Sequence, residues 1–337
     1  MAIGFWRLAI GFWLAFRRAN PFNPFNPFNY MDRRKFIRAS LLGSAALGLG
    51  GLAMPALGKD NEVIQLTVLH TNDMHSRIDP FPKTAKEHAG MGGMARRAAL
   101  IDQIRREGNE VLLLDAGDVF QGTPYFNFFE GSLEFELMSK MGYDTMTLGN
   151  HDFDAGIEGL VKQLPKADFD IVNANYSFED DALKQRVKPY RIFKKEALKV
   201  GVFGVGIQLE GLVLPNLYGG TKYADPIGVA REMAQELRKK GCHLVICLSH
   251  LGNAYDNPSK ISDAILAQKV DGIDLILGGH THTFLPNPLE YQSPEGRKVL
   301  VNQVGWAGIN LGRIDFFFSK SLKKEASKGM ALKLADK

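Results

Sequence analysis

Cysteine is nearly absent from this chain, which has only Cys242 and Cys247 among its 337 residues. So few thiols exclude a disulfide-dense scaffold and a zinc cluster built from thiolates. The two residues are five positions apart on one predicted strand, so their side chains are expected on opposite faces, too far apart to form a disulfide. We therefore interpret both as buried apolar residues.

An excess of charge of one sign is also missing from most of the chain. The formal net charge is +4, but residues 1–58 carry seven Arg and Lys residues against one acid, so residues 59–337 are slightly negative, at −2. A nearly neutral body gives no electrostatic reason to expect nucleic acid as a partner. The composition, 45% apolar and 23% charged, is typical of a globular protein and excludes disorder, collagen and coiled coil.

A strongly apolar run that could span a membrane is lacking as well. Residues 31–58 begin with a basic segment, continue as a mildly apolar run rich in Gly and Ala, and end in Ala56-Leu57-Gly58. This is the anatomy of a secretory signal, and Arg33-Arg34 followed by Phe36-Ile37 is similar to a twin-arginine signal. We predict cleavage near Gly58, export to the periplasm and no stable membrane insertion afterwards; a membrane anchor over Ala39–Leu57 is the alternative.

Residues 1–30 are built from short perfect repeats. Ala-Ile-Gly-Phe-Trp occurs at 2–6 and again at 9–13, and Asn-Pro-Phe occurs three times in succession from Asn20. Such repeats resemble translated simple-sequence DNA. We predict that residues 1–30 are a non-native upstream extension and that Met31 is the true start.

The rest of the chain alternates apolar, strand-like runs with helical patterns. Helices are expected at Ala95–Glu107 and at Pro226–Lys240, the latter with Asp225 as N-cap and proline at its first position. The predicted strands are rich in Val, Ile and Leu, as is typical of strands buried on both faces: Ile64–His70, Val111–Asp115, Thr145–Leu148, Asp170–Asn173, Val200–Val205, His243–Ser249, Asp274–Leu277, Val299–Gln303 and Ile309–Phe318. The expected fold class is α/β, with helices covering the sheets.

Residues typical of metal ligands follow five of these strands. Ligands of open α/β sheets bind beyond the carboxyl ends of the strands, so the five segments are expected to converge on one crevice. Asp, Asn and His without Cys suit divalent ions such as Mn²⁺, Zn²⁺, Mg²⁺ or Fe. Seven such ligands would exceed the need of one ion and suit two ions bridged by a carboxylate; the candidates lie in the segments 71–75, 116–118, 149–154, 249–252 and 278–282. The remaining histidines other than His151, namely His70, His88 and His243, are interpreted as satisfied polar groups.

The ordered blocks D-x-H, G-D, G-N-H-D, S-H and G-H-x-H resemble calcineurin-like metallophosphoesterases. The fuller strings at 70–73, 115–118, 122–123 and 149–154 are similar to the 5′-nucleotidase/UDP-sugar hydrolase group. The resemblance covers roughly residues 62–318 and implies a single-domain, four-layer α/β/β/α sandwich of the metallophosphoesterase type. We place this metallophosphoesterase domain at 59–320, followed by a Lys-rich tail at 321–337; the segment from Ser319 is expected to hold one helix at most.

The resemblance also implies a role for each site residue. His151 and Asp154 match the catalytic pair, in which the imidazole protonates the leaving group and the carboxylate fixes its tautomer. Asp154 could instead cap the following helix. Asp152 stands where the group more often has Glu, and His282 stands where some members have Gln. One ion is assigned to Asp73, His75, Asp118 and His282, and the second to Asp118, Asn150, His250 and His280, with Asp118 bridging.

The implied function is an exported binuclear-metal phosphohydrolase that cleaves phosphomonoesters of the 5′-nucleotide type by attack of a metal-activated hydroxide on phosphorus. A cyclic-nucleotide phosphodiesterase or a sulfur-ester hydrolase of the same superfamily is the alternative. Members of the group usually carry a second, nucleoside-binding domain, whereas this chain ends at Lys337. A catalytic subunit that needs a separate substrate-binding chain is therefore a further hypothesis. An aromatic-rich segment is interpreted as packing or as a base-stacking pocket: Phe120, Tyr125, Phe126, Phe128 and Phe129.

Overall fold

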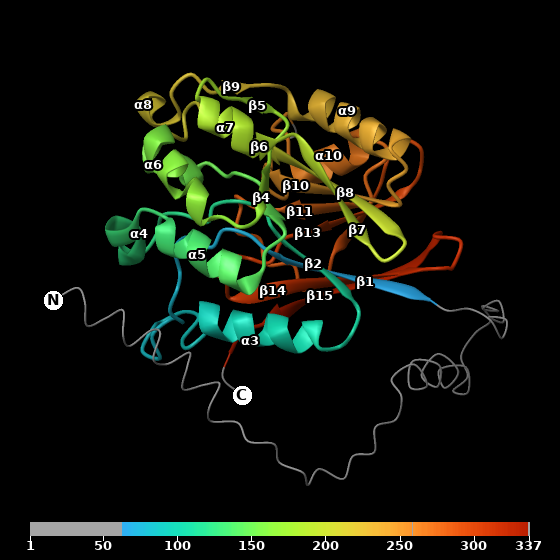
Figure 1. Cartoon of the computed structure of the whole chain (residues 1–337), viewed down its shortest axis with the longest axis horizontal. Coiled ribbons are helices and arrows are strands. Elements are labelled where there is room, and N and C mark those ends of the chain that lie inside the picture. The colour runs from blue at the N-terminus through green and yellow to red at the C-terminus, as the bar shows by residue number, and fades with distance from the viewer. Residues whose placement is uncertain (1–62, 258, 336–337) are drawn as a thin grey trace, which may run out of the picture. The chain divides into compact units, whose positions relative to one another are not determined.

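A computed structural model of the chain describes residues 63–257 and 259–335 (Figure 1). Every described residue belongs to one compact unit, Lys59–Lys337. The predicted extension at 1–30 and the predicted signal at 31–58 lie outside the described residues.

Two large β-sheets form the centre of this unit. The first sheet has seven strands in the order β15-β14-β1-β2-β3-β4-β6. Five of them run parallel, and β14 and β15 join antiparallel beside β1. The strands are β1 (Ile64–Thr71), β2 (Glu110–Asp115), β3 (Thr145–Met146), β4 (Asp170–Val172), β6 (Val187–Lys188), β14 (Asn310–Phe318) and β15 (Lys324–Lys333).

The second sheet has six strands in the order β12-β13-β11-β10-β8-β7, with the four central strands parallel and an antiparallel strand at each edge. A separate two-stranded sheet pairs β5 (Tyr176–Ser177) with β9 (Lys222–Tyr223). The strands of the six-stranded sheet are β7 (Tyr190–Lys195), β8 (Leu198–Gly206), β10 (Leu244–His250), β11 (Leu275–Gly278), β12 (Leu289–Gln292) and β13 (Lys298–Asn302).

Helices connect the strands, and one of them shows the expected start signals. In α9 the Asp225 carboxylate accepts a hydrogen bond from the Gly228 N–H, and Pro226 occupies the first turn, as predicted. The α-helices are α3 (Met94–Arg105), α4 (Pro124–Phe129), α5 (Ser132–Met141), α6 (Gly156–Gln163), α7 (Asp181–Arg186), α8 (Pro215–Tyr218), α9 (Pro226–Lys239) and α10 (Asp263–Lys269). Two 3₁₀ turns complete the set, η1 (His151–Phe153) and η2 (Leu164–Lys166).

Three apolar cores separate four layers. Between the sheets, Leu112 and Leu114 of β2 meet Ile246 and Leu248 of β10. The alternate residue of β2, Leu113, faces α3, α5 and α6 instead, as the two-residue period of a strand requires. On the outer face of the second sheet, β8 and β10 pack on α9 and α10. Figure 1 shows α3 below the first sheet and α9 and α10 above the second. The predicted α/β/β/α sandwich is confirmed.

The nine predicted strands are present within two residues of their expected bounds, but two details of the prediction are wrong. Cys242 precedes β10, so strand alternation does not apply to it, and both cysteines pack in the same helix-facing core. Both are free and buried, as expected. The segment from Ser319 forms β15, not a helix, because its backbone pairs with β14 along most of that strand. The boundary predicted at residue 320 lies within the turn of this hairpin.

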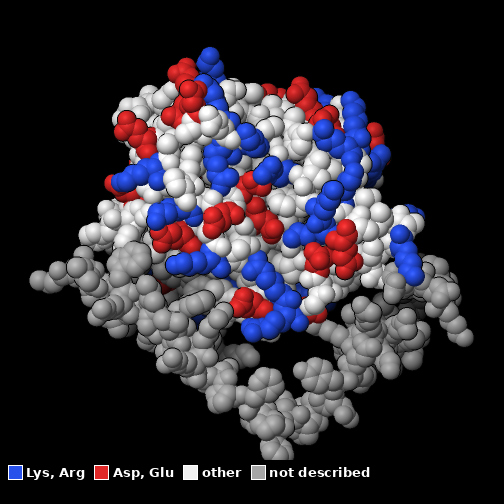
Figure 2. Space-filling view, viewed as in Figure 1, with Lys and Arg blue, Asp and Glu red and all other residues white. Residues whose placement is uncertain are grey.

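Charged side chains are interspersed on the surface. On the face drawn in Figure 2, blue and red residues alternate over helices and loops, so that face carries no broad field of one sign. Among the described residues, no helix has both the length and the hydropathy needed to cross a membrane.

Candidate metal centre

The seven predicted ligands lie on loops or strand ends at one end of the sandwich. Three of the loops follow the neighbouring parallel strands β1, β2 and β3 of the first sheet, and the other two segments end β10 and follow β11 of the second. The loops after β1 and β2 are joined by their backbones, because the Asp73 N–H donates to the Gly117 carbonyl at 2.9 Å and the His75 N–H donates to the Asp118 carbonyl at 3.0 Å. Residues far apart in sequence are thereby brought together.

Five of the seven have left-handed backbone conformations. Such values are uncommon for residues other than glycine and cost free energy, and they cluster at functional sites. The residues and their φ angles are Asp73 (49°), His75 (47°), Asp118 (57°), His280 (74°) and His282 (52°). The surrounding fold holds these turns in place, which aims the side chains inward.

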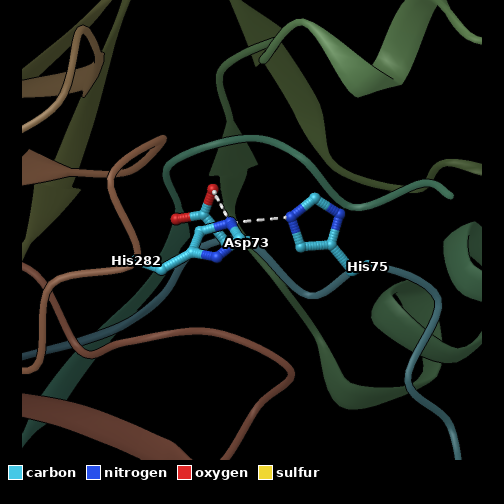
Figure 3. Close-up of side chains that lie close together, drawn as sticks. All are labelled: Asp73, His75 and His282. Atoms are coloured by element: carbon cyan, nitrogen blue, oxygen red, sulfur yellow. Dashed lines mark hydrogen bonds and ion pairs between the residues drawn. The ribbon is translucent and has the colours of Figure 1, made fainter. Parts of the chain in front are cut away.

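Asp73, His75 and His282 form the first ligand group (Figure 3). The Nε2 atoms of the two imidazoles are 2.9 Å apart, and His282 Nε2 is 3.5 Å from Asp73 Oδ1. Burial lowers the pKa of His75, which leaves its ring nitrogen lone pair available. Two imidazole nitrogens beside a buried carboxylate are a donor set suited to a divalent ion.

Asp118, His250 and His280 form the second ligand group. His250 Nδ1 is paired with the Ala116 carbonyl at 2.7 Å, which turns Nε2 toward Asp118 Oδ2 at 3.0 Å. That Nε2 atom is buried and, among the described residues, has no partner with hydrogen-bond geometry. Asn150 Oδ1 lies beside His280 Nδ1 at 2.9 Å, so the fourth predicted ligand joins this group.

The second group contains a buried carboxylate whose charge a bound cation would compensate. Burial disfavours charge on His250, but the Asp118 carboxylate outweighs burial and raises the pKa of His250 to about 10. Burial likewise opposes charge on Asp118, yet His250 holds the pKa of that carboxyl below its usual value. Burial lowers the pKa of His280 to about 4. A divalent ion would compensate the buried carboxylate in place of the proton on His250.

The two groups are contiguous. The His280 N–H donates to both carboxylate oxygens of Asp73, at 2.9 and 3.1 Å, and His250 Nε2 is 3.9 Å from Asp73 Oδ1. The charge of Asp118 also acts on His75, where it offsets part of the lowering of the pKa by burial. The structure thus brings together all seven predicted ligands.

The chain was compared with known proteins. Residues 66–284 match the family described as calcineurin-like phosphoesterase. The chain belongs to this family. The resemblance inferred from the order of the motifs is confirmed, and it places the chain among the metal-dependent phosphoester hydrolases.

Several relatives of this phosphoesterase are named 5′-nucleotidases. The snake venom 5′-nucleotidase of Crotalus adamanteus is 36% identical over 274 residues, 75% of this chain and 45% of that protein. The human 5′-nucleotidase is 34% identical over 295 residues, 81% of this chain and 49% of that protein. A 5′-nucleotidase precursor from Thermus thermophilus has a TM-score of 0.70 at 33% identity, covering 80% of this chain and 55% of that chain. The phosphoesterase thus spans about half the length of the relatives it matches.

His151 and Asp154 stand beside the two ligand groups of the phosphoesterase. His151 Nδ1 is 2.7 Å from Asp154 Oδ2, because the 3₁₀ turn η1 brings residues three apart together. The hydrogen bond to Asp154 raises the pKa of His151 against the effect of burial. The His151 N–H donates to Asp118 Oδ1 at 2.7 Å, and the His151 and His75 ring centroids are 5.2 Å apart. Asp154 does not cap α6, whose N-cap is Ala155 without a side-chain bond.

Asp152 has a role that the sequence analysis missed. Its buried carboxylate accepts hydrogen bonds from four backbone N–H groups, those of Gly149, Asp118, Val119 and Phe120, at 2.8 to 3.2 Å. The loop after β2 and the loop after β3 are joined by this one side chain. In the sequence, only the departure noted above, an Asp where the family group more often has Glu, could have drawn attention to this role.

Some side chains of the aromatic segment are buried in the core, and others are exposed to solvent. Phe120 is fully buried and packs on Phe135, with ring centroids 4.8 Å apart. Phe126 lines a surface pocket of about 430 Å³ together with Ala155, the residue after Asp154. Phe128 is 81% exposed. Packing therefore accounts for Phe120 but not for Phe128.

Two of the three histidines interpreted as satisfied polar groups have hydrogen-bond partners. His70 Nε2 lies 3.0 Å from the side-chain nitrogen of Asn302, and His243 Nδ1 accepts from the Lys199 N–H at 2.9 Å. His88 instead contacts the rings of Phe81, Phe284 and Trp306.

Proposed function

We propose that this phosphoesterase hydrolyses phosphomonoesters of the 5′-nucleotide type with the help of two divalent ions. The observation that carries the proposal is the juxtaposition of two contiguous ligand groups with a hydrogen-bonded His–Asp pair. The relatives described above are named 5′-nucleotidases, which favours a nucleotide as substrate. Because those relatives are about twice as long, their activity is carried over only as part of this proposal.

Each ion is assigned its own set of ligands. The nitrogen and oxygen donors suit Mn²⁺, Zn²⁺, Mg²⁺ or Fe. Bound there, two such ions would polarise the phosphoryl oxygens and lower the pKa of a water molecule. Asp73, His75, Asp118 and His282 would hold one ion, and Asp118, Asn150, His250 and His280 the other, with Asp118 shared.

The side chains beside these ligands would handle the leaving group. Because His151 Nδ1 is paired with Asp154, the proton available to substrate resides on Nε2. Asp154 favours the charged imidazole, so His151 can stabilise developing negative charge and donate its proton to the departing alkoxide oxygen. The His151 side chain is 37% exposed, which leaves room for the ester to approach.

The decisive experiment assays the purified full chain with and without Mn²⁺, after removal of endogenous metal. We expect metal-dependent hydrolysis of 5′-AMP and of p-nitrophenyl phosphate, and much slower hydrolysis of bis(p-nitrophenyl) phosphate. Faster cleavage of the diester would support the phosphodiesterase alternative. Full metal binding without turnover on any ester would support a subunit that needs a separate substrate-binding chain, and absence of metal binding would contradict the proposal itself.

We also propose that the protein is exported to the periplasm by the twin-arginine route from a start at Met31. The paired Arg33-Arg34 and the signal-like anatomy of residues 31–58 support this route. Replacing both arginines with lysine is expected to leave the precursor in the cytoplasm, and N-terminal sequencing of the exported protein should begin near Lys59. An exported protein whose first residue lies within 1–30 would contradict the start assignment.

A further inference from the structure

We propose that Trp306 is a positioning residue that fixes the ring of His282 for metal binding. The indole and the imidazole are stacked, with centroids 5.6 Å apart and planes 7° from parallel. This inference rests on the proposed function, because it concerns the first ligand group, Asp73, His75 and His282. Trp306 lies outside the predicted motifs, and only its place in the fold brings it to the site.

The His282 ring needs support of this kind. Its side chain is 39% exposed, and its backbone has a φ of 52°. A metal-binding imidazole is ordinarily oriented by a hydrogen bond at its other ring nitrogen, as His250 is by the Ala116 carbonyl. No described residue makes such a bond to Nδ1 of His282. Offset stacking on a large aromatic ring supplies the missing orientation.

Trp306 is itself held firmly against the first ligand group. The Asn72 side chain accepts from the Val304 N–H at 3.0 Å and donates to the Gly305 carbonyl at 2.6 Å. The Ala307 N–H donates to the Asp73 carbonyl at 2.7 Å. The backbone on both sides of Trp306 is therefore hydrogen-bonded to the segment that carries Asp73, which fixes the position of the Trp306 backbone beside the first ligand group.

Two further rings contact the indole. Phe81 and His88 meet it edge-on, with centroids 5.8 and 6.5 Å away. They belong to a compact loop, closed by hydrogen bonds between the backbones of Phe81 and both Gly90 and Met91. The indole thus contacts both the first ligand group and this loop, and these contacts limit its rotation.

The first test measures Mn²⁺ binding by the full chain, by calorimetry or equilibrium dialysis. We expect Trp306→Ala to lower the affinity for one of the two Mn²⁺ equivalents by about 10- to 100-fold. This is the cost typical of losing a group that orients a metal ligand. Trp306→Phe should restore most of that affinity, because a phenyl ring can still stack. The matched control is Phe284→Ala. The Phe284 ring contacts His88, and among the described residues it makes no ring contact with the first ligand group.

The outcomes separate this inference from the proposed function. If the unmodified chain binds no Mn²⁺, the proposed function fails. If the unmodified chain and Trp306→Ala bind two equivalents with equal affinity, only the positioning role fails. An equal loss in Phe284→Ala would show that the whole aromatic cluster is needed for loop integrity, and would also overturn the specific role of Trp306.

A second readout does not depend on the folding of a Trp306 variant. The chain contains three tryptophans, at 6, 13 and 306, so Trp6→Phe/Trp13→Phe leaves Trp306 as the sole indole. Paramagnetic Mn²⁺ bound beside this ring should quench its fluorescence. The quenching should saturate when one equivalent of Mn²⁺ is bound at the first ligand group, and His282→Ala should weaken the binding of that equivalent. Fluorescence that stays constant while two equivalents of Mn²⁺ bind would show that Trp306 is not beside an ion and would overturn the proposal.

Discussion

The two ligand groups differ in how their imidazoles are held. In the second group, His250 ends strand β10 and is fully buried, and both His250 and His280 have a polar partner at Nδ1. In the first group, His75 and His282 lie in loops and face each other, and His282 is braced by the indole of Trp306. One group is therefore held by hydrogen bonds and the other partly by ring stacking.

The difference has consequences for metal binding. Hydrogen-bonded, buried ligands are already oriented when an ion arrives, so little side-chain entropy remains to be lost. A half-exposed imidazole held by stacking retains more freedom and has easier access to water. We expect the second group to bind its ion more tightly and the first group to exchange its ion faster.

Asp118 connects the two groups, so its loss should have the largest effect. Asp118→Asn keeps an oxygen that can accept from the His151 N–H but removes the charge beside His250 and His75. We expect kcat/KM to fall on the order of 10⁴-fold, equivalent to about 5.4 kcal/mol, with weaker binding of both Mn²⁺ equivalents. Steady-state kinetics and metal analysis on the same samples would check this.

Asp118→Asn also tests the sharing of this carboxylate directly. If only one equivalent of Mn²⁺ is affected, Asp118 belongs to the second group alone. If two equivalents are retained at full affinity, the assignment of Asp118 as a ligand is wrong.

His151 touches both groups but is assigned to neither, so His151→Ala should keep both ions. We expect kcat on 5′-AMP to fall about 10³-fold, within the range for loss of a general acid. The loss should shrink on p-nitrophenyl phosphate, whose leaving group needs no proton. A loss of bound Mn²⁺ would make His151 a ligand, and an equal deficit on both esters would argue against proton donation.

Asp152→Asn should disturb the second group through its backbone. An amide replaces one acceptor oxygen of a carboxylate that receives four N–H bonds, which leaves at least one buried donor unpaired. We expect the free energy of unfolding to fall by about 1–3 kcal/mol for the metal-free protein. Misplacement of Asp118 should also lower kcat by about 10²-fold.

Denaturant unfolding of the metal-free protein checks the effect of Asp152→Asn on stability. Asp168→Asn is the matched control, because it makes the same change at an exposed position in the loop before β4. Equal stability of the two variants would show that the four hydrogen bonds contribute nothing measurable.

Much of this architecture was predictable from sequence because it rests on local rules. Apolar runs such as Leu112–Leu114 are buried on both faces, and the carboxyl ends of parallel strands share one edge. Those two rules suffice to place the ligands after β1, β2, β3, β10 and β11. The i, i+3 contact of His151 with Asp154 is equally local.

The features that sequence reasoning missed depend on long-range geometry. The Lys-rich β15 lacks an apolar pattern and is a strand because β14 offers an open edge for pairing. The role of Asp152 depends on the directions of four N–H groups on two loops. The stack of Trp306 on His282 joins residues 24 positions apart, and no spacing rule links them.

The smallest effect is expected for His282→Gln. A glutamine oxygen can coordinate a divalent ion, and the exposed edge of the first group leaves room for a differently shaped side chain. We expect Mn²⁺ binding at this group to weaken by about 10- to 100-fold, no less than in Trp306→Ala, because glutamine also loses the stack on the indole. The matched variant His250→Gln should lose much more, because glutamine in a fully buried position must break the bond to Ala116 and leave Asp118 without its imidazole partner. Calorimetric titration of both variants makes the comparison. Equal losses would mean that the two groups are equally rigid, and a larger loss for His282→Gln would reverse the assignment of the tighter site.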